Sequence, residues 1–470
     1  MTSEKTLTVD FTTEIGRIRP ELHSSGFGAM IEGCPQESIN DIKSMGFTAA
    51  RTHDWALLNA NQHVCDYHQI FPLMHLDPAN PDNYVFAPTD YLLKRTREEI
   101  GCDIFFRLGA SIEHSGPNVH FNTVIPDDFE KVAETFAATI RHYNRGWANG
   151  FEWGIKYWEI WNEPDGTNNM WCLPDGDGGK GSTPEEIAAD RNARDQKRFD
   201  LFVKFFVVCL KRIKSEFPEV KVGGPALCWM NEGYFAAIFE ACQKEGIAPD
   251  FISWHHYTGH IPVVMNAIDK GRALCDKYGF KDCELIINEW HFMGPGGFGA
   301  LRSLDPEVRL KVWSGPTSHN GIDSSCFNLS LLSKFQTSKL DQAYYYGCRH
   351  TGAWGYKESY SKYKVYYGLK MFGDFIKALP VICDSTSNGT VTILACKSEN
   401  GRKKGFIVSD YLGDSSEITI EVKGVPQDAE ALVWAHDNER NLELIRVPFV
   451  NGLLTLKKSF AGSAAFSVWF

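Results

Sequence analysis

Residues 157–164 read Tyr-Trp-Glu-Ile-Trp-Asn-Glu-Pro, an apolar and aromatic run that ends in an Asn-Glu pair and a proline. This pattern predicts a short buried strand, which Pro164 prevents from continuing. Because side chains alternate faces along a strand, Glu159 and Glu163 are expected on the face opposite Asn162. Glu163 then lies at the carboxyl end of the strand, where parallel α/β barrels place their reactive groups.

A second stretch repeats this pattern further along the chain. Residues 283–290 read Cys-Glu-Leu-Ile-Ile-Asn-Glu-Trp, again an apolar run that ends in Asn-Glu. The separation of Glu163 and Glu289 leaves room for about three strand–helix units of ~30 or more residues each. Two strand-end carboxylates that face one cleft are the groups that glycoside hydrolysis requires. The competing carboxylates, Glu159 and Glu284, are expected deeper in the barrel or at the start of a strand.

Strands and helices alternate over most of the chain, which predicts an α/β fold with a parallel sheet. The predicted strands are residues 26–31, 46–51, 103–108, 157–163, 220–224, 251–257, 283–289 and 343–347. The predicted helices are residues 37–44, 91–100, 127–143, 184–217, 231–245, 267–278, 324–338 and 363–379. Eight strand–helix units are most simply arranged as a (β/α)₈ TIM barrel, and we expect this catalytic barrel over residues 16–380.

From about residue 381 the pattern changes to short strands in close succession. They are predicted at residues 391–396, 405–409, 417–422, 431–435, 454–456 and 464–469. This spacing is typical of a β-sandwich, which we expect over residues 381–470 as an accessory domain. The alternating run Thr6–Phe11 is expected to join it, because its edge would otherwise lack a partner. Residues 1–15 are therefore assigned to the β-sandwich as its N-terminal strand.

Several other polar and aromatic side chains follow predicted strands and are candidates for substrate binding. They are Arg51, His53, Asn162, Trp171, His255, Tyr257 and Trp354. Arg51 and His53 are two positions apart and so share one face of their strand. The same holds for His255 and Tyr257. Trp171 lies in a Gly- and Asp-rich loop that we expect at the rim of the barrel. Structural alternatives are open here, because the arginine could be a satisfied structural residue and the histidines could be core residues.

The composition argues against several classes of partner. The chain has 48 Lys and Arg residues against 59 Asp and Glu residues, a formal charge of −11, and no concentrated basic block. Such a chain is not suited to a phosphate backbone, so we expect no nucleic-acid partner. No run of ~18 apolar residues is present, which predicts no membrane-spanning helix. The first residues do not have the pattern of a secretion signal, so we expect a cytoplasmic protein unless a signal has been removed.

Neither the 13 cysteines nor the glycine-rich segment indicates a cofactor. The cysteines are scattered and lack close Cys-x-x-Cys pairs, so we interpret them as reduced, mostly buried thiols. Residues 294–299 read Gly-Pro-Gly-Gly-Phe-Gly and lack the pattern of a phosphate-binding loop. We therefore expect no cofactor and no metal. The alternative of a metal-dependent hydrolase would depend on the adjacent His255 and His256.

The two Asn-Glu stretches resemble those of the clan A glycoside hydrolases. In that clan the fourth barrel strand ends in Asn-Glu and the seventh ends in a second glutamate. The resemblance implies that Glu163 is the general acid/base and that Glu289 is the nucleophile. It also implies that Asn162 binds the sugar 2-hydroxyl, that Tyr257 donates a hydrogen bond to the nucleophile, and that Trp354 stacks on the sugar.

Within the clan, the Arg51-x-His53 ending and a β-sandwich assembled from both ends of the chain most resemble glycoside hydrolase family 39. Its members include β-xylosidases and α-L-iduronidases. The clan resemblance covers the barrel to about residue 380, and the sandwich is matched by architecture alone. The chain departs from the most familiar sequence of the family at Asp165 and in the Gly-rich loop that follows it. It also departs in the segment Asn288-Glu289-Trp290.

These observations predict a retaining exo-glycosidase with β-xylosidase-like specificity that acts on small oligosaccharides or glycosides. Two alternatives remain open. One is another specificity of the family, such as α-L-arabinosidase, β-glucosidase or α-L-iduronidase. The other is a catalytically silent carbohydrate-binding relative. The sequence identifies neither the sugar nor the linkage, and a homo-oligomer is a further open alternative.

Overall fold

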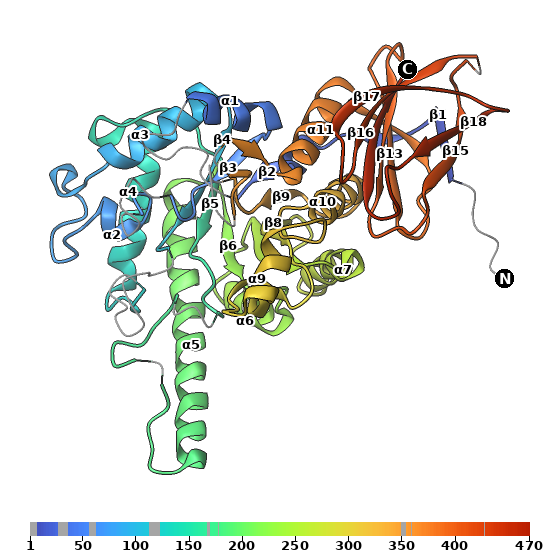
Figure 1. Ribbon diagram of the computed structural model, residues 1–470. Helices are drawn as coiled ribbons and strands as arrows, with labels where there is room; N and C mark the ends of the chain where they lie inside the picture. Colours follow the sequence, from blue (N-terminus) through green and yellow to red (C-terminus); the bar gives the residue numbers. More distant parts are fainter. Residues whose placement is uncertain are drawn as a thin grey trace.

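A computed structural model describes residues 7–26, 36–55, 63–111, 123–166, 170–176, 178–348, 354–358, 360–426 and 428–470. The described chain forms a closed barrel of parallel strands and, beside it, a separate strand-rich sheet (Figure 1). The predicted fold class, a (β/α)₈ barrel with an accessory β-domain, is therefore confirmed. No helix within these ranges is long and apolar enough to cross a membrane.

The barrel closes because its first strand pairs in parallel with its last, Ser24 with Tyr344. Its strands are β2 (Ser24–Ser25), β3 (Ala49–Arg51), β4 (Asp103–Leu108), β5 (Tyr157–Ile160), β6 (Lys221–Leu227), β7 (Phe251–Thr258), β8 (Glu284–Phe292) and β9 (Gln342–Tyr345). The strand predicted at 26–31 lies outside the described residues except for Gly26, and the first barrel strand precedes it. Strand β8 continues past Glu289, so this glutamate lies within a strand and not at its end.

Helices lie between and after the barrel strands in the sequence. They are α1 (Gln36–Met45), α2 (Tyr67–Ile70), α3 (Ala87–Arg95), α4 (Phe129–Arg145), α5 (Pro184–Glu216), α6 (Glu232–Lys244), α7 (Ile261–Lys277), α8 (Gly297–Leu301), α9 (Pro306–Trp313), α10 (Ile322–Phe335) and α11 (Lys364–Ala378). Helix α5 begins with a capping box, in which Thr183 accepts from the Glu186 amide and the Glu186 side chain accepts in return. Its N-terminal half is largely exposed and extends beyond the barrel (Figure 1).

The accessory domain is a sheet that encloses a core of its own. Its strands are β1 (Leu7–Arg17), β12 (Val381–Ser385), β13 (Val391–Lys397), β14 (Lys404–Asp410), β15 (Glu417–Lys423), β16 (Glu430–His436), β17 (Asn441–Pro448), β18 (Leu453–Lys457) and β19 (Ala464–Trp469). Strand β1 lies between β12, to which it is antiparallel, and β15, to which it is parallel. The sequence did not predict β12 or β17. Strand β17 is at an edge of the sheet with mostly exposed side chains, so it lacks the apolar pattern of a buried strand.

Candidate active site

Three strands of the barrel bring two carboxylates and a histidine together. Glu163 follows β5, His255 lies in β7 and Glu289 lies in β8. Nδ1 of His255 is 2.9 Å from Oε1 of Glu163 and 3.3 Å from Oε2 of Glu289. One ring nitrogen and one oxygen from each carboxylate all lie within 4.8 Å of one another. The two glutamates that share the Asn-Glu pattern therefore face the same space.

Arg51, at the end of β3, supplies a buried cation at this site. Its nitrogens donate to three different side chains: Nε to Oε2 of Glu159 at 2.6 Å, Nη1 to Oε1 of Glu289 at 2.7 Å, and Nη2 to Oδ1 of Asn162 at 2.7 Å. A guanidinium suits this arrangement because its donors are held in a fixed plane. Arg51 therefore fixes Glu289 and Asn162 relative to each other.

Replacement of Arg51 by leucine is expected to lower the free energy of unfolding by about 3–5 kcal/mol, because two buried carboxylates would lose their cation. Urea denaturation monitored by tryptophan fluorescence measures the change. Arg51→Lys is the matched control, because lysine keeps the charge without the planar set of donors, and we expect it to lose less stability. A leucine variant as stable as the wild type would contradict this description of the network.

Asn162 lies on the same side as Glu159, so the prediction that it points to the opposite face is wrong. Strand β5 ends at Ile160. Beyond it the backbone has positive φ angles at Trp161 and Glu163, 74° and 45°, a conformation uncommon for residues other than glycine. The amide nitrogens of these two residues donate to carbonyl oxygens of the strands on either side. The chain therefore turns before Asn162, and strand alternation no longer applies.

Glu159 lies deeper in the barrel, where donors occupy both of its oxygens. Oε1 accepts from Oγ of Ser253 at 2.6 Å and from Nδ2 of Asn288 at 2.7 Å, and Oε2 accepts from Arg51. Ser253 and Asn288 were not among the predicted site residues. A signal was present for Ser253, which precedes His255 by two positions and so shares its face of β7.

Tyr257 and His53 border Glu289. The Tyr257 hydroxyl donates to Oε2 of Glu289 at 2.6 Å. Burial and this carboxylate raise the pKa of Tyr257 well above its ordinary value, so the hydroxyl remains a donor. Nε2 of His53 lies 3.6 Å from Oε1 of Glu289, and burial lowers the pKa of His53 well below its ordinary value. His53 is therefore a neutral ring beside the carboxylate.

Burial raises the pKa of Glu289 above its ordinary value, while the protonated forms of His255 and Arg51 act in the opposite direction. The charge of Glu163 raises this pKa further, and the hydrogen bond from Tyr257 lowers it. Burial alone would lower the pKa of His255, but the carboxylates of Glu289 and Glu163 raise it above its ordinary value. A protonated His255 thus lies between the two carboxylates and reduces their mutual repulsion.

Trp354 lies beside Tyr257 in an aromatic cluster. Its ring centroid is 5.7 Å from that of Tyr257, 5.2 Å from that of Tyr346 and 4.8 Å from that of His319. The tryptophan remains partly exposed. Apolar surface is therefore available next to the residue that holds the Glu289 carboxylate.

Trp171 does not lie in the site, so this prediction is wrong. Its side chain is buried between helices α4 and α5, where it contacts Phe129, Phe202 and Phe205. Its Nε1 donates to the carbonyl oxygen of Arg198 at 3.0 Å. The segment that carries Trp171 packs against the helical layer, and the tryptophan fills the core there.

His255 and His256 do not form a pair of ligands. Neighbouring residues of a strand point to opposite faces. Burial lowers the pKa of His256 to about 4, without a contribution from either carboxylate. This arrangement gives no support to a metal site built on the two histidines.

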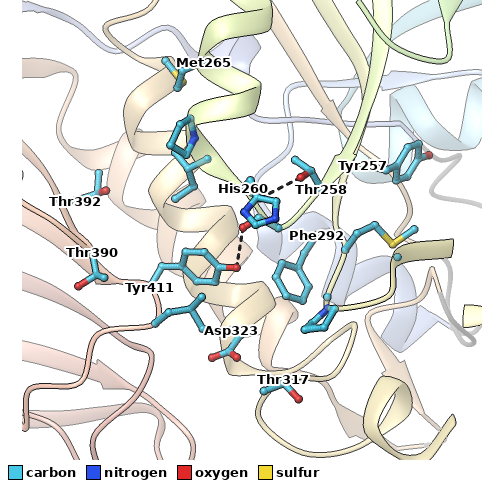
Figure 2. A pocket seen from close by; sticks show the side chains of 18 of the residues that line it. Tyr257, Thr258, His260, Met265, Phe292, Thr317, Asp323, Thr390, Thr392 and Tyr411 are labelled. Atoms are coloured by element: carbon cyan, nitrogen blue, oxygen red, sulfur yellow. Dashed lines mark hydrogen bonds between the residues drawn. The ribbon is translucent and has the colours of Figure 1, made fainter. Parts of the chain in front are cut away.

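A cavity of about 890 Å³ adjoins the site where the barrel meets the accessory sheet (Figure 2). Tyr257 and Phe292 line it from the barrel, and Tyr411 lines it from the sheet. The Tyr411 hydroxyl donates to the carbonyl oxygen of Gly259 at 2.9 Å and so connects the two parts of the molecule. Tyr257 therefore contacts both the Glu289 carboxylate and this cavity.

The chain is similar in sequence to two proteins named beta-xylosidase. It is 27% identical over 143 residues to that of Geobacillus stearothermophilus, which covers 30% of this chain and 23% of the relative. It is also 27% identical over 221 residues to that of Caldicellulosiruptor saccharolyticus, which covers 45% of this chain and 37% of the relative. The matched segments thus span well under half the length of these relatives. No protein-family model matches the chain.

The fold is similar to that of a solved glucosidase from Croceicoccus marinus. The two structures align with a TM-score of 0.72 over 98% of each chain, at 18% sequence identity. The likeness therefore extends over the barrel and the accessory sheet. At this level of sequence identity the likeness shows that the two proteins share a fold.

Proposed function

We propose that this chain is a retaining exo-glycosidase in which Glu289 is the nucleophile and Glu163 the general acid/base. The observation that carries the proposal is the separation of their carboxylates, which have oxygens within 4.8 Å of each other. Retaining enzymes place the two carboxyl groups about 5–5.5 Å apart, whereas inverting enzymes need about 6.5–9.5 Å to admit a water. The short separation therefore favours attack by a carboxylate.

In the first step the Glu289 carboxylate attacks the anomeric carbon while the glycosidic C–O bond breaks, and the leaving oxygen takes the proton of Glu163. A glycosyl ester on Glu289 and a free alcohol result. In the second step Glu163 takes a proton from water as the water oxygen attacks the anomeric carbon, and Glu289 leaves as a carboxylate. Two inversions at one carbon give net retention.

The neighbouring side chains support these roles. Arg51 and Tyr257 each donate to the Glu289 carboxylate, which favours its ionised form. Asn162, fixed by Arg51, is placed to bind the 2-hydroxyl of the sugar. Trp354 offers a ring for the apolar face of the substrate. His53 and His255 complete the wall around Glu289.

We further propose that the substrates are β-xylosides or related pentosides, released from the end of small oligosaccharides or glycosides. Both sequence relatives bear the name beta-xylosidase. Residues 16–380 would form the catalytic unit, and residues 1–15 and 381–470 the accessory β-domain. The pairing of β1 with β12 and β15 supports this division.

A panel of nitrophenyl glycosides, with the anomer of the first product followed by ¹H NMR, tests the proposal. We expect turnover of a β-xyloside or another pentoside and initial formation of the product with the same anomeric configuration. Initial formation of the opposite anomer would overturn the retaining mechanism. Binding without turnover of every sugar would favour a silent carbohydrate-binding protein, and loss of activity in a chelator would favour a metal-dependent hydrolase.

Replacement of Trp171 by phenylalanine is expected to lower the free energy of unfolding by about 1–3 kcal/mol and leave KM unchanged, because this side chain fills the core between α4 and α5. Thermal denaturation and steady-state kinetics on the best substrate of the panel check both parts. Trp354→Phe is the comparison variant at the site, and we expect it to raise KM. A raised KM in Trp171→Phe without a loss of stability would return Trp171 to the substrate site.

A further inference from the structure

A third carboxyl group, that of Asp165, is buried beside the proposed acid/base. Asp165 follows Glu163 by two residues, just past Pro164. Its Oδ1 accepts a hydrogen bond from the backbone amide of Cys228 at 2.9 Å. Its Oδ2 is buried and accepts no hydrogen bond from a nitrogen or oxygen donor in the described part of the chain. One oxygen of this carboxylate is thus held by a backbone amide, and the other has no nitrogen or oxygen donor to compensate its burial.

Cys228 links Asp165 to Glu163. Both carboxyls interact with its thiol and raise the pKa of Cys228, in addition to the larger effect of burial. The same sulfur lies close to the chain at Gly166, where an added Cβ would be 2.7 Å from Sγ and 3.4 Å from Cβ of Glu163. A single thiol can contact both carboxyls only if they lie on the same side of the turn.

The carboxyls of Glu163 and Asp165 and the groups around them come from five elements. They are Glu163 and Asp165 after β5, Cys228 after β6, His255 in β7, Glu289 in β8, and Tyr234 in α6. Burial raises the pKa of Asp165 to about 6; the charge of Glu163 raises it as well, whereas the Cys228 amide and His255 lower it. Electrostatic repulsion is mutual, so ionised Asp165 must raise the pKa of Glu163 in turn.

We propose that Asp165 is a positioning residue that keeps the proton on Glu163 through its own negative charge. The inference rests on the proposed role of Glu163 as acid/base. A general acid must be protonated when the leaving group departs, at a pH at which an ordinary glutamate is ionised. His255 draws the proton away from Glu163 because it stabilises the carboxylate, and Asp165 opposes this effect from the other side.

The test is the isosteric variant Asp165→Asn, which keeps the oxygen that accepts from the Cys228 amide and removes the charge. The fall of kcat/KM at high pH reports ionisation of the acid in the free enzyme. Loss of a neighbouring negative charge lowers the pKa of Glu163, so this limb is expected to move to lower pH by about one unit. Asp282→Asn, an exposed carboxylate in the turn before β8, is the matched control and should leave the limb in place.

A second measurement needs no substrate. In protein labelled with ¹³C at the glutamate carboxyls, the Glu163 signal is identified by its absence in Glu163→Gln, and its titration is followed by NMR. We expect two steps in the wild type, one from Asp165 and one from Glu163 itself, and one step at lower pH in Asp165→Asn. A single step in the wild type, or a well-folded variant with an unmoved titration, would overturn the inference. Inactivity of the wild type on every glycoside would instead refute the proposed function and leave this titration interpretable.

Discussion

Glu289→Ala is expected to lose turnover of an aryl β-xyloside by roughly 10⁴-fold or more, because no other group can form the covalent glycosyl intermediate. The truncated side chain leaves room for a small anion in its place. Added azide is expected to restore turnover and to give a glycosyl azide of inverted configuration, because azide enters on the face that Glu289 occupied. The rate with and without azide, and the anomer of the product by NMR, measure this.

Glu284→Ala is the matched control for that experiment. Glu284 begins the same strand, where it accepts from the Tyr157 hydroxyl at 2.9 Å and forms an ion pair with Lys221. It is the first residue of β8, whereas Glu289 lies further along the strand, so we expect its loss to affect stability and leave kcat largely unchanged. Wild-type turnover in Glu289→Ala would show that the nucleophile has been assigned to the wrong residue.

Glu163→Ala is expected to show a loss that depends on the leaving group. A positioned general acid contributes about 10²–10⁴-fold, so a substrate with an alkyl or sugar leaving group should lose activity by that factor. A dinitrophenyl glycoside needs little protonation, so its first step should be much less affected. Azide should again restore turnover, but with retained configuration, because it attacks the intermediate on Glu289.

The two variants are thus separated by the stereochemistry of the azide product. Inverted product from Glu289→Ala and retained product from Glu163→Ala would assign each role independently. Equal losses for good and poor leaving groups in Glu163→Ala would contradict its role as the acid. Gln in place of Glu163 keeps the volume of the side chain and controls for local collapse.

The barrel could be predicted from the sequence because its strands are short apolar runs that end in polar groups. The same reasoning singled out Glu163 and Glu289 as a catalytic pair, which stays a prediction, and the structure places the two carboxylates close together. It failed at Asn162, because the positive φ of Trp161 depends on neighbouring strands that a local pattern does not contain. A bare sequence shows only that Asn162 is next to Glu163.

Trp171 shows a second limit of sequence reasoning. A tryptophan among Gly and Asp residues has the composition of an exposed loop, yet its ring is buried against α4 and α5. Packing of a loop against helices depends on contacts between distant residues, and no periodicity reveals them. Asp165 illustrates the same point, because its proximity to Cys228 depends on the turns after both β5 and β6.

The position of β1 imposes an order on the folding of the two parts of this protein. Strand β1 leaves the ribosome before the barrel strands, but its partners are β12 and β15, which ends at Lys423. The last barrel strand, β9, ends at Tyr345, so the barrel can close while β1 still has no partner. Domains generally fold as units during translation, so the barrel is expected to form first. The accessory sheet then forms around β1, which has no strand partner until β12 and β15 are synthesised. Completion of that sheet then joins β1 to strands that are synthesised after the whole barrel.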